Sequence, residues 1–577
     1  MAEIEYVSNK KKPLPWIIGG FGLTIILLLS SILVFYPFAS SEKKAFFHGV
    51  NPILFNGSQV GNAHLEGKKI YVPLAFVQKK IDNSILLDKK SKSIIITTRN
   101  KVIQIPLDSL TYFENTHPLK LQVPSFTIIQ GREYISLDSI LSYYSIRYKI
   151  LNGTKAIWIQ HDGEIFRSSS ISTKEMNRAR LRLRTSPSLQ SPYTAETFKK
   201  EVVMVEGEKD GFYLVRKENG ISGYLKKDIV KLGKKETVKI TQIKQPFTLS
   251  KINRPIQLTW EAVYSKNPDY TKIPTLTGVN VVSPTWFSLN DQNGNIKNLA
   301  SLDYSKWAKS KGYQVWGLFS NHFDPVLTHE ALKDYETRQK LISQLLQYSK
   351  AYQLQGINFD IENVHQEDGP LVTQFLREAA PFLHDAGLVI SIDITFSAAD
   401  SDWSSFYERK RLSQIVDYVI VMAYDEHWGS SSGSGSVASL PWVESNLQKL
   451  LAKVPNQKLV LGVPLYSRLW KEQVNSDGTK ELSSKALTMD QVKQWLKEYA
   501  VTPVYDPKTG QNYAEYFNAK ENATYKIWIE DDLSLKKRSD LYGKYHLAGI
   551  ASWARYFADQ TAWTALDLNS QKAYTKK

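Results

Sequence analysis

Residues 356–362, Gly-Ile-Asn-Phe-Asp-Ile-Glu, are the most informative segment of the chain. Side chains alternate along a β-strand, so Asn358, Asp360 and Glu362 share one face while the apolar side chains between them share the other. Three polar groups on an inward face make a poor core. Two carboxyls about 7 Å apart along the strand repel each other, which raises the pKa of one of them. A carboxyl that stays protonated near neutral pH is what general acid catalysis needs.

This segment is one of eight apolar runs in the C-terminal half of the chain. The runs alternate with helical spacing, as at residues 332–348 and 371–384, which is typical of βαβ units in a parallel sheet. The expected strands are Ile256–Glu261, Val279–Ser283, Gln314–Phe319, Gly356–Glu362, Val389–Phe396, Tyr418–Tyr424, Leu459–Pro464 and Gly549–Trp553. Eight strand–helix units in ~250 residues predict an α/β TIM (β/α)8 barrel. The long gap at 469–540 predicts a small inserted subdomain within the barrel.

Polar and aromatic residues recur at the ends of the later strands, and catalytic residues of TIM barrels lie at the C-terminal ends of strands. The sixth strand ends in Met422-Ala-Tyr424-Asp425, which adds a phenol and a carboxylate to the C-terminal end of the barrel, where Asp360 and Glu362 are expected. The seventh leads into Gly462-Val-Pro-Leu-Tyr466-Ser-Arg468, and the eighth ends in Trp553, expected as an aromatic face at the pocket floor.

Together these motifs resemble glycoside hydrolase family 18, the family of chitinases and N-acetylglucosaminidases, over residues 255–560. Within the family the chain is most similar to the branch of spore cortex-lytic and germination-associated N-acetylglucosaminidases. Two positions depart from the typical chitinase pattern, because Gln355 and Asn358 stand where Asp is usual. Asn at the second position is familiar in the peptidoglycan-acting branch, but it removes a charge partner of Asp360.

The resemblance implies a retaining, substrate-assisted mechanism, one of the exceptions to the two-carboxylate rule. It implies that Glu362 protonates the leaving oxygen, that Asp360 orients the 2-acetamido group of the substrate, and that Tyr424 donates a hydrogen bond to it. Further residues are expected to shape the sugar subsite: Asn358, Met422, Asp425, Tyr466, Arg468 and Trp553. The resemblance implies no metal and no organic cofactor, and the scattered His322, His365 and His427 do not suggest a metal site.

Other interpretations of these residues and of the function stay open. Asp360 and Glu362 can form a structural pair at a barrel rim, and Met422 and Trp553 can be ordinary core residues. A non-catalytic, lectin-like wall-binding protein is one alternative function, although such proteins usually lose the acid at the position of Glu362. A chitinase-type enzyme acting on chitin is the other.

Residues 46–160 contain short β-rich segments and a weak internal repeat. Tyr71-Val-Pro-Leu74 followed by Ser93-Ile-Ile-Ile96 recurs, 63 residues later, as Tyr134-Ile-Ser-Leu137 followed by Ala156-Ile-Trp-Ile159. Each copy predicts a strand, a short helix and two further strands. The segment resembles the copper amine oxidase N-terminal-like domain, a stalk module of bacterial surface proteins, and we expect it to act as a spacer without a metal site.

Residues 176–232 predict a second small β module. The order of its motifs, from Arg182-Leu-Arg-Thr-Ser-Pro-Ser188 through Gly211-Phe-Tyr-Leu-Val-Arg216 to Gly223-Tyr-Leu-Lys-Lys227, resembles the bacterial SH3-like domain. Such a module often binds wall peptides, although aromatic residues also simply fill a small barrel. A basic linker is expected at 233–254, either as a solvated segment or as a contact for anionic wall polymers.

Residues 16–38, Trp16 to Phe38, form an uncharged stretch of 23 residues preceded by Lys10, Lys11 and Lys12. About 20 apolar residues span a bilayer as a helix, whereas the core of a signal peptide is usually 7–15 residues long. The stretch therefore predicts a single transmembrane anchor after a cytoplasmic tail at 1–15, with the catalytic part facing the cell wall outside the membrane. A signal peptide cleaved near Ala39-Ser-Ser41 is the alternative.

Composition limits the remaining classes of function. The chain has 577 residues, a formal net charge of +16 and no cysteine, which excludes a disulfide scaffold, thiol catalysis and cysteine-ligated metals. The excess charge is +18 over residues 1–254 and −2 over residues 255–577. The basic half suits a tether near anionic wall polymers, and the extracytoplasmic topology argues against a nucleic-acid partner. The expected partners are the membrane, through one helix, and peptidoglycan or another N-acetylglucosamine polymer.

Overall fold

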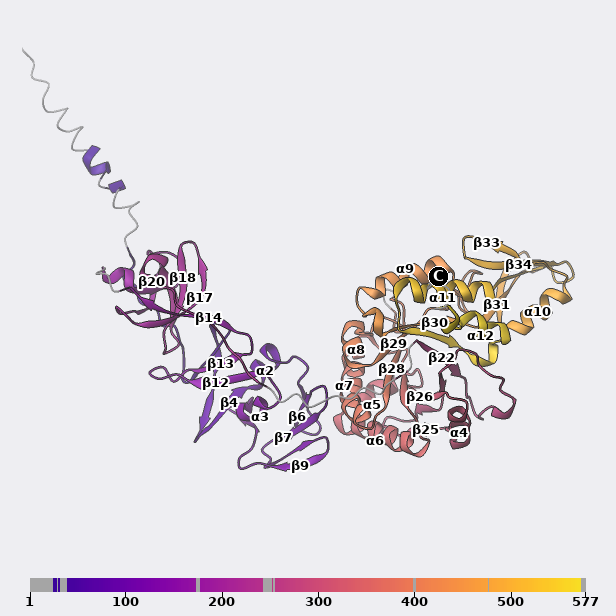
Figure 1. Ribbon diagram of the computed structural model, residues 1–577, viewed down its shortest axis with the longest axis horizontal. Coiled ribbons are helices and arrows are strands. Elements are labelled where there is room, and N and C mark those ends of the chain that lie inside the picture. The colour runs from indigo at the N-terminus through magenta and orange to yellow at the C-terminus, as the bar shows by residue number, and fades with distance from the viewer. Residues whose placement is uncertain are drawn as a thin grey trace, which may run out of the picture. The chain divides into compact units, whose positions relative to one another are not determined.

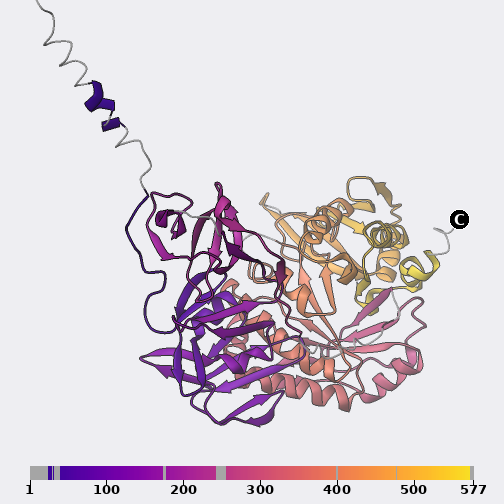
Figure 2. The same cartoon turned by 60° about the vertical axis from the view of Figure 1, so that its left-hand side comes forward.

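The computed structural model describes residues 24–28, 30–31, 39–172, 177–241, 252, 255–397, 401–475 and 477–571. The chain divides into two compact units, one made of residues 1–83 with 127–244 and the other of residues 84–126 with 245–577. The second unit holds the predicted catalytic half together with a short segment from the N-terminal half. Figure 1 shows the strands and helices of both units, and Figure 2 shows them turned by 60°.

The predicted TIM barrel is present, and all eight predicted strands are found. They are β22 (Ile256–Glu261), β23 (Val281–Pro284), β26 (Gln314–Ser320), β27 (Gly356–Asp360), β28 (Val389–Thr395), β29 (Tyr418–Met422), β30 (Leu459–Pro464) and β36 (Gly549–Trp553). Each is parallel to its neighbours in the order β23-β22-β36-β30-β29-β28-β27-β26, and pairing of β23 with β26 closes the ring. A hairpin of β24 (Phe287–Leu289) and β25 (Ile296–Asn298) extends beside β26.

Helices surround the barrel, as the crossover connections of parallel strands require. They are α4 (Leu302–Ser310), α5 (Pro325–Leu332), α6 (Tyr335–Ala351), α7 (Gly369–Asp385), α8 (Arg409–Ile415), α9 (Leu440–Leu451), α11 (Asp532–Tyr545), α12 (Gln560–Leu566) and α13 (Leu568–Gln571). Side chains at several N-caps accept backbone N–H groups of the first turn, such as Ser301 for α4 and Asp324 for α5. The apolar faces of the helices and the buried strands form one continuous core.

An inserted subdomain lies between β30 and β36, as predicted, but with different bounds from 469–540. It is a five-stranded antiparallel sheet with one helix. Its elements are β31 (Tyr466–Val474), β32 (Lys480–Thr488), α10 (Met489–Glu498), β33 (Val504–Asp506), β34 (Gln511–Asn518) and β35 (Ala523–Ile529). The sheet starts at Tyr466, directly after the barrel strand, and α11 follows the sheet and packs on β30 and β36 of the barrel as well as on β34.

The predicted repeat is present, although its first copy is divided between the two units. One copy has β4 (Lys69–Pro73) and α2 (Leu74–Lys80), and the other has β11 (Arg132–Ser136) and α3 (Leu137–Leu141); β4 and β11 pair antiparallel. Two strands follow each helix, β5 (Leu86–Asp88) and β6 (Ser93–Thr97) after the first, β12 (Ile146–Ile150) and β13 (Ile157–His161) after the second. The further strands are β1 (Pro52–Phe55), β2 (Ser58–Asn62), β3 (His64–Glu66) and β10 (Phe126–Ile129).

The strands after α2 do not stay with the first unit. Together with β7 (Val102–Pro106), β8 (Thr111–Glu114) and β9 (His117–Lys120), β5 and β6 form a five-stranded antiparallel sheet. This sheet, residues 84–126, belongs to the same compact unit as the barrel. The predicted stalk domain at 46–160 therefore contributes to both units, because apolar side chains of β6 and β7 are buried against barrel helices.

The second β module is an antiparallel sheet in the order β16-β15-β19-β18-β17-β14-β20, with β21 also paired to β14. Its strands are β14 (Ile165–Ile171), β15 (Arg182–Arg184), β16 (Tyr193–Glu196), β17 (Val202–Lys209), β18 (Phe212–Arg216), β19 (Ser222–Lys226), β20 (Val230–Lys231) and β21 (Lys235–Thr237). The module is wider than the predicted 176–232, and the predicted linker at 233–254 begins with β21, because β14 offers this strand a free edge. Its assignment as SH3-like stays a prediction.

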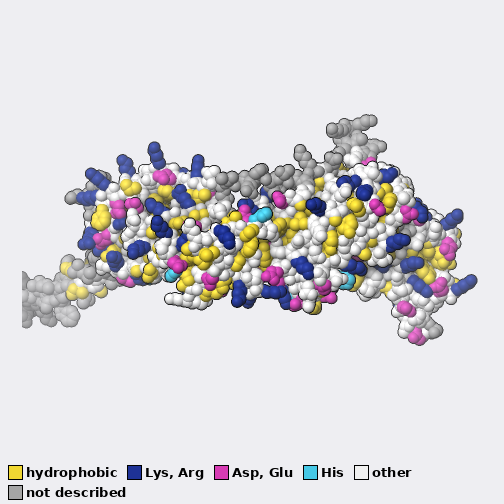
Figure 3. Space-filling view, turned by 90° about the horizontal axis from the view of Figure 1, so that it is seen from below, with side chains coloured by type: hydrophobic (Ala, Val, Ile, Leu, Met, Phe, Trp, Pro, Cys, Tyr) yellow, Lys and Arg dark blue, Asp and Glu magenta, His cyan; other side chains and the backbone are white. Residues whose placement is uncertain are grey.

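The predicted anchor at 16–38 lies mostly outside the described residues. Within the part of the chain that the structure describes, no helix has the length and apolar character needed to cross a bilayer. On the face shown in Figure 3, Lys and Arg side chains are spread among Asp and Glu side chains instead of gathering in one patch.

Candidate active site

The predicted acid, Glu362, lies two residues beyond the end of β27 and not on the strand itself. Its main chain is held from the neighbouring strand end, because its N–H donates to Asn321 Oδ1 at 3.0 Å and its carbonyl accepts from Asn321 Nδ2 at 2.7 Å. The Tyr407 hydroxyl donates to the carbonyl of Ile361 at 2.8 Å. Two side chains therefore hold the backbone on which the Glu362 carboxyl is mounted.

Asp360, the last residue of β27, is withdrawn from water. It is 8% exposed, and its Oδ1 is buried without a hydrogen-bond partner among the described residues. Burial raises the pKa of Asp360 to about 7. The pKa of the half-buried Glu362 is raised well above its usual value, first by desolvation and then by the charges of Asp360 and Asp425. A raised pKa favours the protonated carboxyl that general acid catalysis requires.

Asn358 lies behind Asp360 and is completely buried. Its Oδ1 accepts from Trp260 Nε1 at 2.9 Å and from Ser283 Oγ at 3.1 Å, and its Nδ2 donates to Asp393 Oδ1 at 2.8 Å. The structure thus places this predicted substrate-binding residue in a hydrogen-bond network beneath the site. The network brings a further carboxyl, Asp393 of β28, next to Asp360.

The strand-six motif lies at the same end of the barrel. Met422 ends β29, and Tyr424, which is partly buried, follows it. Burial raises the pKa of Tyr424 well above its usual value, and the nearby Asp393 adds to the effect. A phenol with a raised pKa keeps its proton and can donate a hydrogen bond.

Asp425 is linked to the inserted subdomain. It has a left-handed backbone conformation with φ of 60° and accepts a hydrogen bond from the hydroxyl of Tyr466, the first residue of β31. Arg468, two residues further on β31, donates to Ser484 Oγ of β32 at 3.3 Å. Tyr466 therefore reaches Asp425 from the insertion and not from a barrel strand, and the charge of Arg468 opposes the burial that raises the pKa of Asp425.

Trp553, the last of the predicted site residues, lies at the end of β36. It is partly exposed, and its ring centroid lies 5.9 Å from that of the buried Trp260 of β22. Trp260 also donates to Asn358, which in turn donates to Asp393. The two tryptophans therefore connect Trp553 with the hydrogen-bond network beneath Asp360. Asp360, Glu362, Met422, Tyr424, Asp425 and Trp553 thus lie at or just after the ends of barrel strands, whereas Asn358 lies within β27 and Tyr466 and Arg468 lie on β31.

Three residues that support the site were missed by sequence reasoning: Asn321, Asp393 and Tyr407. Asp393 carried a usable signal, because it alternates with Ile392 and Ile394 in a predicted strand, as Asp360 does with its own neighbours. Asn321 and Tyr407 lie in loops far from residue 362 in sequence, and nothing in their local pattern indicates that they contact its neighbourhood.

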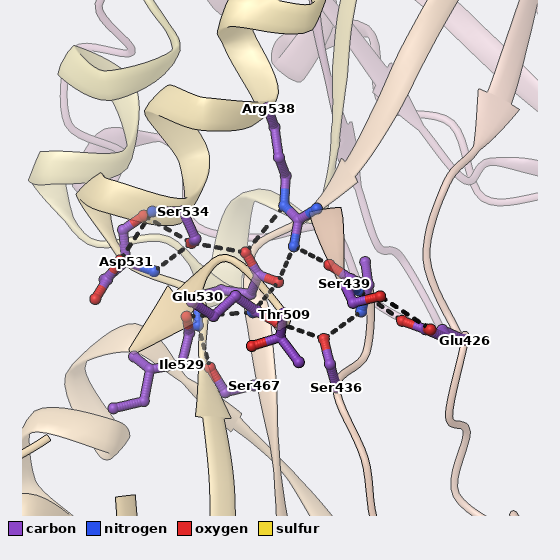
Figure 4. A network of polar contacts seen from close by, with 12 residues as sticks. Glu426, Ser436, Ser439, Ser467, Thr509, Ile529, Glu530, Asp531, Ser534 and Arg538 are labelled. Carbon is purple, nitrogen blue, oxygen red and sulfur yellow. Dashed lines mark hydrogen bonds and ion pairs between the residues drawn. The ribbon is translucent and has the colours of Figure 1, made fainter. Parts of the chain in front are cut away.

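The loop after β29 is fixed by a polar network at the base of the insertion (Figure 4). Glu530, after β35, is fully buried and accepts from Arg538 of α11, from Gln511 Nε2 at 2.8 Å and from Ser534 Oγ at 2.9 Å. Arg538 also donates to the carbonyl of Ala438. Further along the loop, Ser439 donates to Glu426 through its N–H and its hydroxyl. The network ties the loop that carries Asp425 to the insertion and to α11.

Two family models match the chain. The model described as "Glycosyl hydrolases family 18" matches residues 262–558, and the model described as "Copper amine oxidase N-terminal domain" matches residues 54–159. Both matches fall within the segments for which the sequence predicted these families.

Several known proteins are similar over the C-terminal half. An uncharacterized glycosylase of Bacillus subtilis, YvbX, is 27% identical over 301 residues, which cover 50% of this chain and 84% of that protein. The cortical fragment-lytic enzyme of the same organism is 26% identical over 256 residues, 44% of this chain and 58% of that enzyme. The spore cortex-lytic enzyme SleL of Bacillus megaterium aligns over 58% of this chain and 77% of that structure, at 19% identity and a TM-score of 0.49.

Proposed function

The chain belongs to glycosyl hydrolase family 18, and on the basis of its site we propose that it cleaves β-1,4 bonds in peptidoglycan that contains N-acetylglucosamine. The observation that carries this proposal is the set of buried carboxyls at the ends of β27 and β28. Here the pKa of Glu362 is raised by burial and by neighbouring carboxylates, and its main chain is held in place by Asn321.

The proposed mechanism is retaining and substrate-assisted, as for the exceptions to the two-carboxylate rule. Glu362 gives its proton to the glycosidic oxygen, and the acetamide oxygen of the substrate attacks the anomeric carbon to form an oxazolinium. Asp360 aligns the acetamide and balances its positive charge, and Tyr424 donates a hydrogen bond to it. Water then opens the ring while Glu362 takes back a proton, so the configuration is retained.

The sugar subsite has additional aromatic surface in loops that follow barrel strands. Phe323, after β26, and Trp403, after β28, are 40% and 43% exposed, with ring centroids 6.3 Å apart, and Trp428, after β29, is 55% exposed. Exposed aromatic faces suit the apolar faces of sugar rings. We assign these side chains to the polymer that extends from the cleavage site.

The choice of peptidoglycan over chitin rests on the relatives and on the N-terminal modules. The B. subtilis relative is named for acting on cortical fragments. More distant relatives at 24% identity or below are named as a chitinase and di-N-acetylchitobiases, and they keep chitin-type substrates as the second candidate. The basic N-terminal half suits anionic wall polymers better than uncharged chitin.

We also propose that residues 16–38 anchor the protein in the cell membrane, with the catalytic unit outside facing the wall. Fractionation of cells that produce the 577-residue chain or a chain beginning at Ser41 tests this. The full chain should sediment with membranes and resist high salt, whereas the shortened chain should be soluble. Equal distribution of both chains would contradict the anchor.

Zymography in gels that contain purified peptidoglycan tests the catalytic assignment. The wild-type chain should clear the gel, and Glu362→Gln should clear it at least ~10²-fold more weakly, because the general acid is lost. Asp490→Asn, a substitution of a surface carboxyl on α10, serves as the matched control and should keep full activity. Equal clearing by wild type and Glu362→Gln would favour the lectin-like alternative.

The bond that is cleaved is identified from the products. Mass spectrometry of the released muropeptides should find N-acetylglucosamine at the new reducing ends. N-acetylmuramic acid at those ends would contradict cleavage after N-acetylglucosamine. Release of oligosaccharides from chitin but not from peptidoglycan would support the second candidate substrate.

A further inference from the structure

Asp393 is a buried carboxyl that the mechanism above does not use. It lies on β28, is 1% exposed, and is the direct register partner of Asp360 on the parallel strand β27. Residues in register on adjacent parallel strands point to the same face, with strands about 4.8 Å apart. Two carboxyls therefore face the barrel interior side by side, one of them belonging to the proposed catalytic machinery.

The surroundings of Asp393 disfavour a negative charge on both Asp393 and Asp360. The groups that face it are Asp360 and Glu362 from β27 and its end, Tyr424 from the end of β29, Tyr407 from the loop before α8, and Trp260 from β22. The pKa of Asp393 is raised well above its usual value, first by burial and then by the charge of Asp360, although the hydrogen bond from Asn358 opposes this. Two adjacent buried carboxyls lower their energy by sharing one proton.

Among the described residues, Asp360 Oδ1 is an acceptor that is free to receive that proton. Asp360 Oδ1 is buried and has no hydrogen-bond partner among the described residues, whereas Asp393 Oδ1 already accepts from Asn358 Nδ2. A protonated Asp393 has an O–H group to donate, which an ionised carboxylate lacks. Donation to Asp360 would satisfy a buried acceptor whose isolation otherwise costs about 1–3 kcal/mol.

We propose that Asp393 supplies, from the neighbouring strand, the carboxyl that Asn358 lacks, and that Asp393 and Asp360 hold one proton between them. The pair then carries one negative charge, and Asp393 is a positioning residue that acts through Asp360. This inference rests on the proposed function, because it assigns Asp360 a role in turnover. Beyond the proposed mechanism, it states that the charge on Asp360 depends on Asp393, a residue of the neighbouring strand.

The reciprocal exchange of the two side chains tests this pairing. Asp393→Asn removes the shared proton but keeps an amide oxygen that can accept from Asn358. Asn358→Asp with Asp393→Asn returns a carboxyl to the strand of Asp360, where Trp260 and Ser283 can donate to it. The full chain and its variants are assayed for kcat/KM against pH on 4-nitrophenyl diacetylchitobioside, with Glu362→Gln as the inactive reference.

The O–H group of a shared proton is a stronger donor to the ionised partner than the amide N–H that Asp393→Asn puts in its place, so the substitution makes Asp360 harder to ionise. We expect the acidic limb of kcat/KM to move to higher pH by about one unit in Asp393→Asn, with about a tenfold loss below the limb. The double variant should regain most of this shift. An unmoved limb in Asp393→Asn, or a double variant no closer to wild type, would overturn the proposal.

A second measurement needs no turnover. Infrared difference spectra are compared at neutral pH for Glu362→Gln and for Glu362→Gln with Asp393→Asn, so that the acid itself does not contribute. The first protein should show the band of a proton shared between two carboxyls, and in the second this band should be replaced by that of a singly protonated Asp360 at another frequency. Identical spectra would overturn the shared proton. Absence of hydrolysis by wild type, with this band present, would instead contradict the proposed function alone.

Discussion

Three carboxyls withdrawn from water at the ends of β27 and β28 destabilise the folded protein as pH rises. The pKa values of Asp360, Glu362 and Asp393 are all raised, with burial as the main cause. A carboxyl whose pKa is raised in the folded state binds a proton more tightly there than in the unfolded chain. Their contribution to the free energy of unfolding is therefore fully present below the pKa of the unfolded chain, about 4. It is lost as the pH rises through the pKa values of the folded state.

Removal of one of these carboxyls should stabilise the protein at neutral and alkaline pH. We expect Glu362→Gln to raise Tm at pH 8 by about 2–4 °C, the shift that roughly 1 kcal/mol produces, and to raise it less at pH 4.5. Calorimetry of both proteins at the two pH values measures this. Glu481→Gln, a change of an exposed carboxyl on β32, is the control. A Tm difference that does not grow with pH would show that ionisation of Glu362 does not destabilise the folded protein.

Asn321 holds Glu362 without being close to it in sequence. Asn321→Ala removes both hydrogen bonds to the Glu362 main chain, and we expect kcat/KM to fall about 10- to 100-fold because the acid loses its fixed position. Steady-state assays on the chromogenic substrate named above measure the effect. Asn512→Ala removes a comparable bond, 2.7 Å to Asp531 in the insertion, and should leave kcat/KM within about twofold of wild type. Equal losses in the two variants would exclude a specific role of Asn321.

At the scale of elements, the insertion is joined to the barrel by buried charge and not only by apolar contact. Glu530 and Arg538 are both almost completely buried, and each also contacts polar groups of other segments. Such a pair is weak evidence for net stability, but removal of one partner leaves an uncompensated charge in the interior.

Arg538→Met should therefore destabilise the catalytic unit by about 3–5 kcal/mol, and the double variant with Glu530→Gln should be less destabilised than Arg538→Met alone. Urea unfolding of each variant measures the difference. Lys544→Met, on the same helix, breaks an exposed ion pair with Glu444 and should cost less than about 1 kcal/mol. If Arg538→Met lowers the free energy of unfolding no more than Lys544→Met does, the buried pair does not stabilise the attachment of the insertion to the barrel.

At the scale of the molecule, the sheet of β5 to β9 is part of the catalytic unit although it precedes the barrel by some 130 residues. Ile95 and Val102 are buried with Tyr335 of α6, and Phe382 of α7 packs against them. Asp88 accepts from the N–H of Tyr335 at 2.8 Å and so caps α6 from another module, while Asp334 at the N-cap pairs with Lys90. The sheet therefore supplies a hydrogen-bond acceptor and apolar contacts to the first turn of α6.

Asp88→Ala should lower the stability of the catalytic unit by about 1–3 kcal/mol, because it leaves a helix N–H without its partner in a buried site. Calorimetry of the full chain should show a lower Tm for the transition of this unit. Asp228→Ala breaks an exposed pair with Arg180 in the other unit and serves as the control. An unchanged transition in Asp88→Ala would mean that the sheet contributes nothing to the barrel.

Much of the fold was predictable from the sequence because its signals are local. All eight barrel strands were located, since each is a short apolar run between helical segments, and the internal repeat of the stalk was found from its 63-residue offset. The two family resemblances and the glycosidase class were confirmed by the family matches. The SH3-like module, the membrane anchor and the roles of the site residues stay predictions.

What the sequence determined by itself is the set of residues on each strand face, because alternation along a strand depends only on the local backbone. It identified Asp360 in this way, whereas Glu362, expected on the same strand face, lies beyond the end of β27. The tertiary structure alone decided which strand supplies the neighbour of Asp360, which loop holds Glu362, and that residues 84–126 join the barrel. These contacts connect segments that are tens to hundreds of residues apart, and only closure of the barrel and burial of apolar surface bring them together.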